Sequence, residues 1–326
     1  MPLSEFDIIT RYFAQATPGR EDVVLGIGDD AALIDPPAGQ QLVVAIDTLV
    51  AGVHFPLDTD PYDIGWKALA VNLSDLAAMG AQSAWLTLAL TLEQGDDHWL
   101  AAFSRGLADL AGQYGLQLVG GDTTRGPLTV TVQVAGYLPS GQALTREGAA
   151  PDDEIWVSGT LGDAALGLRI AQGQLQADDS VKATLCRRLN RPQPRLPLGI
   201  ALRGIASSCI DISDGLLADL GHLCAAADCG AGLQYADLPL SSAAHDLIAA
   251  DPALGDLPLI GGDDYELCFT APAKRHGDIQ ALAAQLACPL TCIGRIEAEP
   301  GIRCFEEDGR PRPVTGQGYR HFNESN

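Results

Sequence analysis

The chain is organised around one stretch, Asn72-Leu73-Ser74-Asp75-Leu76-Ala77-Ala78-Met79-Gly80, in which a single carboxylate stands among apolar and small residues. Asp60-Pro61 is a helix-start signal and Gly80 is a helix stop, so the sequence predicts a long helix with Asp75 near its end. A charged side chain in apolar surroundings is costly unless it has a partner. We therefore expect Asp75 to do more than interact with solvent.

Four other short stretches share this pattern of acids beside Gly, Ser or Thr and apolar runs: residues 26–30, 47–48, 120–123 and 211–215. Two unit charges about 4 Å apart repel by about 4 kcal/mol at an effective dielectric constant of about 20, so converging carboxylates need cations. Carboxylate oxygens suit Mg²⁺, which usually keeps waters and shares its shell with substrate phosphates. If the fold brings these stretches together around Asp75, they form a multi-carboxylate metal site for phosphate chemistry.

Composition limits the class of protein. The 326 residues, 47% of them hydrophobic, are enough for two medium domains, which we place at 1–140 and 141–326 on either side of a polar connection. A net charge of −22 argues against a nucleic-acid or anionic-membrane partner. The eight cysteines lack CxxC pairs, so we expect reduced core thiols. Without a signal-peptide pattern or a run of about 18 apolar residues, we expect a soluble, cytoplasmic protein.

Apolar periodicity predicts an α/β (α+β) chain of alternating strands and helices. In the first half we expect a helix capped by Ser4, and further elements at 41–46 (strand), 60–80 (helix), 84–92 (strand), 96–114 (helix), 116–119 (strand) and 127–138 (strand). In the second half we expect a strand at 154–158, a helix from 213 to about 227, a helix around 279–286 and short strands near 293 and 302–305.

Several motifs also have a purely structural interpretation. The glycines at 159 and 162 lack the GK[ST] end of a P-loop and the GxGxxG pattern, so a tight turn is favoured over phosphate binding. Ser213 or Asp214 could be only the N-cap of the following helix, although capping leaves Asp211 unexplained. The acids at 263–264 could be turn formers, and His54 could be incidental. Of the adjacent acids at 29–30, only one is expected to face a site.

The residue types restrict the reaction. None of the three lysines stands in a Gly-rich loop, which excludes a P-loop kinase, and the chain has no GxSxG, HExxH or dinucleotide motif. Phosphoryl transfer depends on positioning and on neutralising phosphate charge, which Mg²⁺ and an arginine, either Arg125 or Arg146, can also supply. The residues alone indicate a Mg²⁺-dependent enzyme that could use a nucleotide.

Taken together and in order, eight segments resemble the thiamine-monophosphate kinase family: 26–32, 47–50, 52–55, 70–80, 120–126, 144–146, 211–215 and 261–269. Gly318-Tyr319 extends the resemblance to the end of the chain. It implies a two-domain aminoimidazole ribonucleotide synthetase-like fold with mixed sheets flanked by helices. Metal binding, nucleotide binding and dimerisation would lie in the first domain. It also implies a homodimer that phosphorylates thiamine monophosphate with ATP, giving thiamine pyrophosphate by direct in-line transfer.

The same resemblance implies a set of site residues. The Mg²⁺ ligands would be Asp30, Asp47, Asp75, Asp122, Asp211 and Asp214, with Asp75 bridging several ions. The nucleotide-contacting positions would be Gly121, Asp122, Arg146 and Ser213. The thiamine-substrate positions would be His54, Asp263 and Tyr319, with Tyr319 suited to stacking and Asp263 to bonding the aminopyrimidine. No catalytic residue separate from the metal site is expected, because the acceptor phosphate oxygen is already anionic.

Two positions depart from the family pattern. Ile46 stands where the family often has a small hydroxyl residue, so position 46 supplies no side-chain oxygen. Asp263 stands where a glutamate is expected, and its reach is shorter. Two other functions remain open: a non-catalytic protein that binds nucleotide or thiamine phosphate, and another ATP-dependent member of the superfamily. Because the first cysteine is Cys186, a selenophosphate synthetase with its N-terminal cysteine is disfavoured.

Overall fold

The computed structural model describes residues 4–314 and Gly318. The chain forms two compact units. The N-terminal unit contains the residues up to Leu76 and residues 81–143, and the C-terminal unit contains Ala77–Gly80 and the residues from Leu144 onward. The boundary predicted after residue 140, and the roles given to the two domains, stay predictions.

The N-terminal unit is built on one sheet and a short ribbon. Its strands are β1 (Val23–Leu25), β2 (Leu33–Ile34), β3 (Gln40–Val50), β4 (Gln82–Leu92), β5 (Gln117–Arg125) and β6 (Thr129–Pro139). The sheet has the order β3-β6-β4-β5, and β1 pairs with β2 to form the ribbon. β6 is antiparallel to β3 and to β4, whereas β4 and β5 are parallel.

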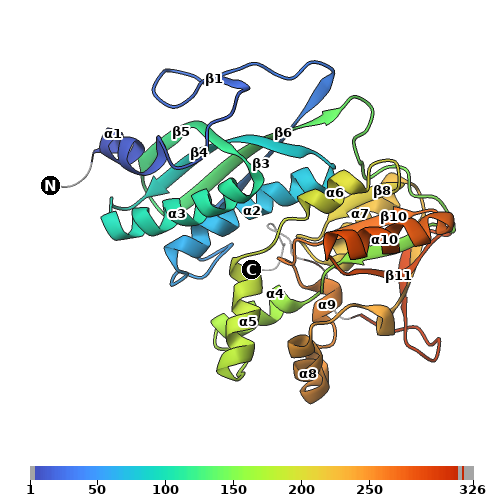
Figure 1. Ribbon diagram of the computed structural model, residues 1–326. Helices are drawn as coiled ribbons and strands as arrows, with labels where there is room; N and C mark the ends of the chain where they lie inside the picture. Colours follow the sequence, from blue (N-terminus) through green and yellow to red (C-terminus); the bar gives the residue numbers. More distant parts are fainter. Residues whose placement is uncertain (1–3, 315–317, 319–326) are drawn as a thin grey trace. The chain divides into compact units, whose positions relative to one another are not determined.

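Helices cover one face of this sheet. The helices of the unit are α1 (Glu5–Ile8), the π-helix η1 (Ile9–Phe13), α2 (Pro61–Ala78) and α3 (Asp97–Tyr114). Figure 1 shows α2 and α3 lying along the same face of β3 to β6. Ser4 caps α1 in a capping box with Asp7, and Asp96 caps α3. The predicted helix around Asp75 is confirmed as α2.

The two faces of the sheet differ in composition because successive side chains of a strand point to opposite faces. The valines at 130, 132 and 134 of β6 are fully buried under the helices. On β3, by contrast, Leu42, Val44 and Ile46 are 51%, 48% and 61% exposed. Within the N-terminal unit the sheet therefore leaves apolar side chains uncovered on its second face.

The C-terminal unit is built on a six-stranded sheet. Its strands are β7 (Glu154–Ser158), β8 (Ser208–Asp211), β9 (Gly230–Gln234), β10 (Leu267–Ala271), β11 (Leu290–Glu297) and β12 (Gly301–Phe305). They follow the order β12-β9-β11-β7-β10-β8, and every pairing is antiparallel except the parallel pair β12 and β9. β8, which ends at Asp211, is thus an edge strand of this sheet.

Seven α-helices are described in this unit: α4 (Asp163–Ala171), α5 (Asp179–Asn190), α6 (Leu196–Ala201), α7 (Leu216–Ala226), α8 (Ser242–Ala250), α9 (Leu257–Ile260) and α10 (His276–Leu286). Three 3-10 turns accompany them: η2 (Tyr235–Asp237), η3 (Pro252–Leu254) and η4 (Ala273–Arg275). The main core lies between α7 and the sheet, and a smaller core joins α4, α5 and α8. Mixed sheets flanked by helices in two units confirm the predicted fold class.

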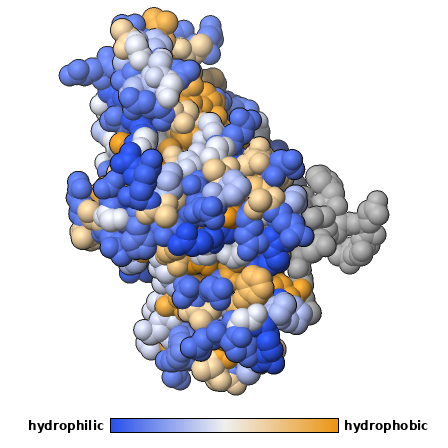
Figure 2. Space-filling model, turned by 90° about the vertical axis from the view of Figure 1, so that its right-hand side faces the viewer, coloured by the Kyte–Doolittle hydropathy of each residue, from blue (hydrophilic) through white to orange (hydrophobic). Residues whose placement is uncertain are grey.

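The surface and the thiols agree with the composition. On the face drawn in Figure 2, hydrophilic residues cover most of the surface and hydrophobic residues form separate patches. All eight cysteines are free, and six of them are buried. Among the residues that the structure describes, none of the helices has the length and apolarity needed to cross a membrane.

Candidate functional site

Asp47 and His54 lie close together in the N-terminal unit. Asp47 is near the end of β3, on the helix-covered face, and is partly buried. Burial raises the pKa of its carboxyl, and the interaction with the nearby His54 side chain opposes part of that rise. A partly desolvated carboxylate of this kind gains from a cation beside it.

The loop after β3 fixes the orientation of His54. The Nδ1 atom of His54 accepts a hydrogen bond from the backbone N–H of Val50 at 2.9 Å. The backbone N–H of His54 donates to the Val50 carbonyl at 3.0 Å. The neutral imidazole therefore carries its proton on Nε2, which is the nitrogen that can donate to a ligand. Lys67 of α2, only 2% exposed, donates from Nζ to the His54 carbonyl at 3.4 Å. A buried ammonium thus holds the histidine loop against α2.

Asp75 is partly exposed, whereas nearly every residue around it in α2 is buried. Asn72 and Ser74 are both fully buried. Asn72 Nδ2 donates to the Ala68 carbonyl at 3.0 Å, but Asn72 Oδ1 and Ser74 Oγ have no hydrogen-bond partner in the described part of the chain. A buried polar group without a partner costs about 1–3 kcal/mol. These two oxygens are of the kind that water around a cation would satisfy.

Gly121 and Asp122 lie in β5 at the other side of the same sheet. Gly121 must be glycine, because a Cβ there would stand 1.9 Å from the Leu88 carbonyl oxygen of β4. Asp122 is exposed and pairs with Ala89. A cross-strand row runs from Asp47 through β6 and β4 to Gly121. Three strand spacings of about 4.8 Å put the ends of that row roughly 14 Å apart, so Asp47 and Asp122 cannot share one ion.

Asp30 and Arg146 are exposed. Asp30 follows β1, and its N–H is bonded to Oδ1 of Asp29 at 2.9 Å, so the two neighbouring acids are in contact through the backbone. Arg146 lies in the connection after residue 143, and the Thr145 carbonyl beside it accepts the N–H of Cys209 in β8 at 2.9 Å. Arg125, the other arginine considered, bonds the Glu93 carbonyl through Nε at 3.2 Å.

In the C-terminal unit the acids at 211–214 lie in a tight loop between β8 and α7. Asp211 is 6% exposed, and Ser213 and Asp214 are partly buried. The interpretation of Ser213 or Asp214 as the N-cap is wrong: Gly215 is the N-cap and gives no side-chain cap bond. The loop is capped from inside the helix by Asp219, whose Oδ2 accepts the N–H groups of Ser213, Asp214 and Gly215.

Asp219 is 3% exposed, and its pKa is raised to about 7. Burial is the main cause, the negative charge of Asp211 adds to it, and the hydrogen bonds from the loop oppose it. Asp211 and Asp219 are therefore close enough to repel. A cation at Asp211 would relieve that repulsion.

The segment before β10 holds the same loop from its other side. The N–H of Asp263 donates to the Ser213 carbonyl at 2.8 Å, and the N–H of Tyr265 donates to the Ile212 carbonyl at 2.8 Å. Asp263 and Tyr265 have φ values of 71° and 49°, in the left-handed region. The acids at 263–264 thus belong to an irregular segment that packs on the Asp211 loop, and Asp263 lies beside Ser213.

Asp264 explains the Gly-rich turn after β7. It is 3% exposed; Oδ2 accepts the Gly162 N–H at 2.7 Å, and Oδ1 is 3.4 Å from the N–H of Ala164. The carboxyl group of Asp264 therefore occupies the N-terminus of α4, where a phosphate would bind. This agrees with a structural turn at residues 159–162. Burial raises the pKa of Asp264 to about 8, against the hydrogen bonds from Gly162 and Ala164 and the charge of Arg188.

Glu266 forms a buried charge network beside this segment. It is 1% exposed and accepts bonds from Arg195 Nε and Nη2 at 2.6 Å each, from Arg188 Nη2 at 2.8 Å and from Ser158 Oγ at 2.6 Å. Burial raises the pKa of Glu266, but the bonds and charges of Arg195 and Arg188 outweigh it and hold that pKa below the usual value. Glu266 thus ties β10 to helices α5 and α6.

Gly318, a described residue in the last part of the sequence, packs against the Asp211 loop. Gly318 lies against it so closely that a Cβ there would be 2.7 Å from the Asp214 carbonyl oxygen and 2.6 Å from Ala218 Cβ. Tyr319, the predicted stacking residue, lies outside the described residues. Gly318, which precedes Tyr319 in the sequence, therefore lies beside Asp214, a residue of a different sequence motif.

The donor set fits Mg²⁺ by its chemistry: carboxylate oxygens, several of them in aspartates that are buried or partly buried, and two buried oxygens that have no hydrogen-bond partner among the described residues. In the part of the chain that the structure describes, however, no group of three or more His, Cys, Asp or Glu side chains could by itself hold an ion. The separation across the sheet of the N-terminal unit gives one physical reason. The metal ligands stay a prediction.

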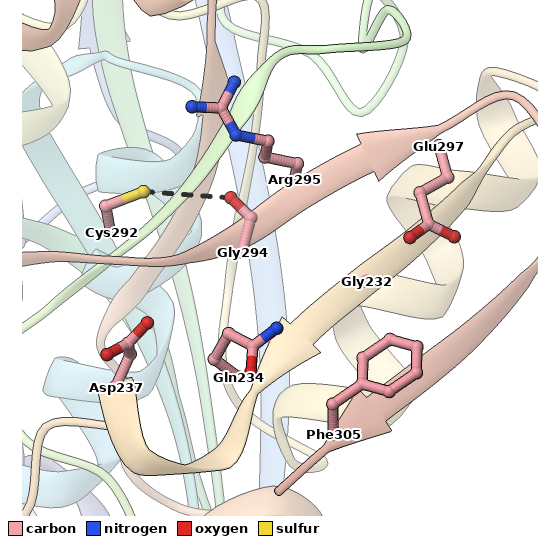
Figure 3. Close-up of a pocket in the computed structure, with 8 residues that line it drawn as sticks. All are labelled: Gly232, Gln234, Asp237, Cys292, Gly294, Arg295, Glu297 and Phe305. Atoms are coloured by element: carbon pink, nitrogen blue, oxygen red, sulfur yellow. Dashed lines mark hydrogen bonds between the residues drawn. The ribbon is translucent and has the colours of Figure 1, made fainter. Parts of the chain in front are cut away.

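A pocket of about 300 Å³ lies at the other edge of the C-terminal sheet, on β9, β11 and β12 (Figure 3). The residues that line it include the side chains of Arg295, Asp237 and Phe305 and the glycines at 232 and 294. None of the described site residues lines it. Asp211 stands on β8, at the opposite edge, so this pocket is separate from the predicted site.

Sequence reasoning missed the supporting residues Asp219, Asp264, Glu266 and Lys67. Asp219 carried a detectable signal, because it is an acid in the first turn of a helix that follows an acidic loop. The bonding partners of Asp264 and Glu266 stand some 70 to 110 positions earlier in the chain, so no local pattern could have indicated them.

Comparisons with known proteins place the whole chain in a family. Residues 28–138 match the family described as AIR synthase related protein, N-terminal domain, and residues 150–306 match its C-terminal domain. A thiamine-monophosphate kinase of Escherichia coli strain K12 is 51% identical over 323 residues, which are 99% of each chain.

Two solved structures are similar in fold and in sequence. The thiamine-monophosphate kinase from Stenotrophomonas maltophilia K279a has a TM-score of 0.87 and 50% identity, and covers 96% of this chain and 99% of its own. The structure of AaThiL complexed with AMPPCP and TMP has a TM-score of 0.78 and 30% identity, covering 91% and 92%. With both domain families matched in order and full-length identity of this size, the chain belongs to the AIR synthase related proteins and, within them, to the thiamine-monophosphate kinase family.

Proposed function

We propose that this protein is a thiamine-monophosphate kinase, which transfers the γ-phosphoryl group of ATP to the phosphate of thiamine monophosphate and releases ADP and thiamine pyrophosphate. One observation carries the proposal: relatives that are named for this activity are 51% identical over 99% of both chains. The AaThiL complex supports the two substrates, since AMPPCP is a non-transferable ATP analogue and TMP is the acceptor.

The proposed metal is Mg²⁺, in several ions. Its ligands would be Asp30, Asp47, Asp75 and Asp122 of the N-terminal unit and Asp211 and Asp214 of the C-terminal unit. When bound, the ions would neutralise the phosphate oxygens and hold donor and acceptor phosphates in register. Two observations support a cation requirement: the partial burial of Asp47, and the charge repulsion between Asp211 and Asp219.

The remaining site residues would bind and orient the substrates. Gly121 has no side chain to obstruct a nucleotide, Arg146 supplies an exposed guanidinium, and Ser213 supplies a hydroxyl. For thiamine monophosphate, His54 would donate from Nε2, Asp263 would accept from the aminopyrimidine and Tyr319 would stack on a ring. The acceptor oxygen of a phosphate is already anionic near neutral pH, so we propose no separate general base.

We also propose a homodimer formed through the sheet of the N-terminal unit. Leu42, Val44 and Ile46 of β3 present an apolar surface on the face that the helices leave uncovered. Apolar surface of this kind on a sheet favours association with a second copy, because burial removes it from water. The exposure of Ile46 also gives this departure from the family pattern a role at the proposed interface. The free cysteines suit the reducing cytoplasm, where we place the protein.

The test is an assay of both products. The purified chain is incubated with Mg-ATP and thiamine monophosphate, and nucleotides and thiamine esters are separated by chromatography. The proposal predicts ADP and thiamine pyrophosphate in equal amounts, with none when Mg²⁺ is removed by a chelator or when unphosphorylated thiamine replaces the monophosphate. Mg-ATP binding without either product would overturn it in favour of a non-catalytic binding protein.

A further inference from the structure

Asp219 holds the Asp211 loop by an unusual arrangement of hydrogen bonds. One oxygen atom, Oδ2, accepts three consecutive backbone N–H groups: Ser213 at 3.0 Å, Asp214 at 3.1 Å and Gly215 at 3.2 Å. Successive N–H groups that converge on one point form a concave anion-binding site of the kind that elsewhere holds a phosphate oxygen. Here the anion is a carboxylate of the same chain, and it is 3% exposed.

This arrangement is more than a helix cap. α7 begins at Leu216, so the N–H groups of Ser213 and Asp214 lie before the helix and its N-cap. Asp219 therefore fixes the backbone of the two residues that were predicted to contact nucleotide and metal. A cap that served the helix alone would bond only the N–H groups of its first turn.

The loop is fixed on its other side as well. The carbonyls of Ile212 and Ser213 accept the N–H groups of Tyr265 and Asp263, each at 2.8 Å. Gly262 packs so closely that a Cβ would be 2.4 Å from the Ser213 carbonyl oxygen. Because Asp219 accepts its N–H, the backbone of Ser213 has no free donor for a phosphate, and the hydroxyl is the donor that can reach one.

We propose that Asp219 is the positioning residue of the nucleotide and metal site: it fills the anion-binding turn at residues 213–215, directs the nucleotide to the Ser213 hydroxyl, and sets the direction of the Asp214 carboxylate. The assignment of nucleotide and metal to this loop rests on the proposed function. The shape of the loop rests on the hydrogen bonds alone, and the two parts can be tested separately.

The first measurement is hydrogen exchange of the wild-type full chain, read by NMR or by mass spectrometry with fragmentation to single residues. The amides of Ser213, Asp214 and Gly215 lie in neither a helix nor a strand, yet they should exchange at least tenfold more slowly than exposed loop amides such as Gly19. Rapid exchange at all three would overturn the proposal without any variant being made.

The variants are Asp219→Asn, Ser213→Ala and a matched control, Asp163→Asn. Asp163 is also a buried acid in the first turn of a helix, 1% exposed, but it accepts from the hydroxyls of Thr160 and Ser241, outside the loop. Calorimetric titration measures the affinity for Mg-ATP, and hydrogen exchange measures the exchange rates of the amides at residues 213–215. The kinase assay gives kcat and the KM for thiamine monophosphate separately.

For Asp219→Asn we expect faster exchange at residues 213–215 and Mg-ATP affinity lower by about 10- to 100-fold, the usual effect of removing a group that orients a ligand-binding residue. The KM for thiamine monophosphate should stay within about twofold. Ser213→Ala should weaken Mg-ATP by roughly 3- to 10-fold, as for one hydrogen bond, with unchanged exchange. Asp163→Asn should lower stability but leave both loop exchange and Mg-ATP affinity as in the wild type.

Three results would overturn the proposal: wild-type exchange at 213–215 in Asp219→Asn, wild-type Mg-ATP affinity in that variant, or an equal loss of affinity in the Asp163→Asn control. The kinase proposal fails differently. If the wild type binds Mg-ATP but makes no thiamine pyrophosphate, the reaction is wrong, whereas exchange and affinity still decide the role of Asp219.

Discussion

Replacing Glu266 by glutamine should destabilise the C-terminal unit more than any exposed charge change. Glu266 is 1% exposed and neutralises two guanidinium groups, those of Arg188 and Arg195, whose side chains are 21% exposed. The variant keeps the shape but removes the charge, and its amide nitrogen offers a donor where Arg195 or Ser158 also donates. Both guanidinium groups then lose a partner in surroundings that hold little water.

The magnitude follows from these contacts. Breaking a buried pair by removing one partner costs about 3–5 kcal/mol. The partial exposure of the arginines reduces the cost, and Arg188 keeps Asp163 at 3.6 Å as a second acid. We therefore expect a loss of about 3 kcal/mol in the free energy of unfolding of the C-terminal unit. The effect on the N-terminal unit should be negligible, because the contacts of Glu266 described above all lie within the C-terminal unit.

The assay is urea unfolding followed by pulsed hydrogen exchange, with β10 peptides reporting on the C-terminal unit and β6 peptides on the N-terminal unit. The matched control is Asp278→Asn, which removes the acid from an exposed ion pair: the Arg275 side chain is 40% exposed and the Asp278 side chain 53%. This change should lower the free energy of unfolding by less than about 1 kcal/mol. If Glu266→Gln shifts the β10 midpoint no more than this control does, the buried network does not stabilise the fold as we argue.

Three further predictions concern catalysis, pH and assembly. Asp75→Asn should abolish turnover while leaving the unfolding midpoint within error of the wild type, and near-normal activity in the product assay would remove Asp75 from the site. Asp264 has its pKa raised to about 8 from a usual 3.8, so between about pH 4 and pH 8 the unfolded chain has released a proton that the folded chain keeps. The free energy of unfolding therefore falls as pH rises through this window, by up to about 1.4 kcal/mol per pH unit. When unfolding is measured at pH 5 and pH 8, Asp264→Asn should show a smaller fall than the wild type. An equal fall in both proteins would contradict the prediction. Val44→Glu on the uncovered sheet face should convert a dimer to a monomer in sedimentation velocity. The control Phe6→Glu, which alters a side chain that is 76% exposed on α1, should leave the dimer intact. A wild-type protein that sediments as a monomer would refute the proposed interface.

The elements could be predicted from the sequence because their signals are local. Residues a few positions apart predict the strand at 84–92, the cap at Ser4 and the helix at 96–114, and each is observed. The helix around Asp75 likewise begins at Pro61 and ends two residues before Gly80. Local physics decides these features, so a single sequence is sufficient for them.

The supporting contacts of the site could not be predicted in the same way. The choice between Ser213 and Asp214 as an N-cap missed Asp219, because three N–H groups converge on one oxygen only after the loop has turned. A turn is one interpretation of the acids at 263–264, and the family resemblance gives Asp263 a substrate contact. Neither reveals that Asp264 accepts the N–H of Gly162, about a hundred positions earlier, or that the N–H of Asp263 donates to the Ser213 carbonyl. These pairings come from the strand order of the C-terminal sheet, in which β10 lies between β7 and β8.

The central claim is that this chain moves a phosphoryl group from ATP onto thiamine monophosphate. The most direct test supplies ATP labelled with ³²P in the γ-position and follows the label by chromatography. We expect Mg²⁺-dependent transfer of the label into thiamine pyrophosphate, in amounts equal to the ADP formed, by the wild type and not by Asp75→Asn. Label that appears only as inorganic phosphate, or that reaches thiamine pyrophosphate equally well with Asp75→Asn, would contradict it.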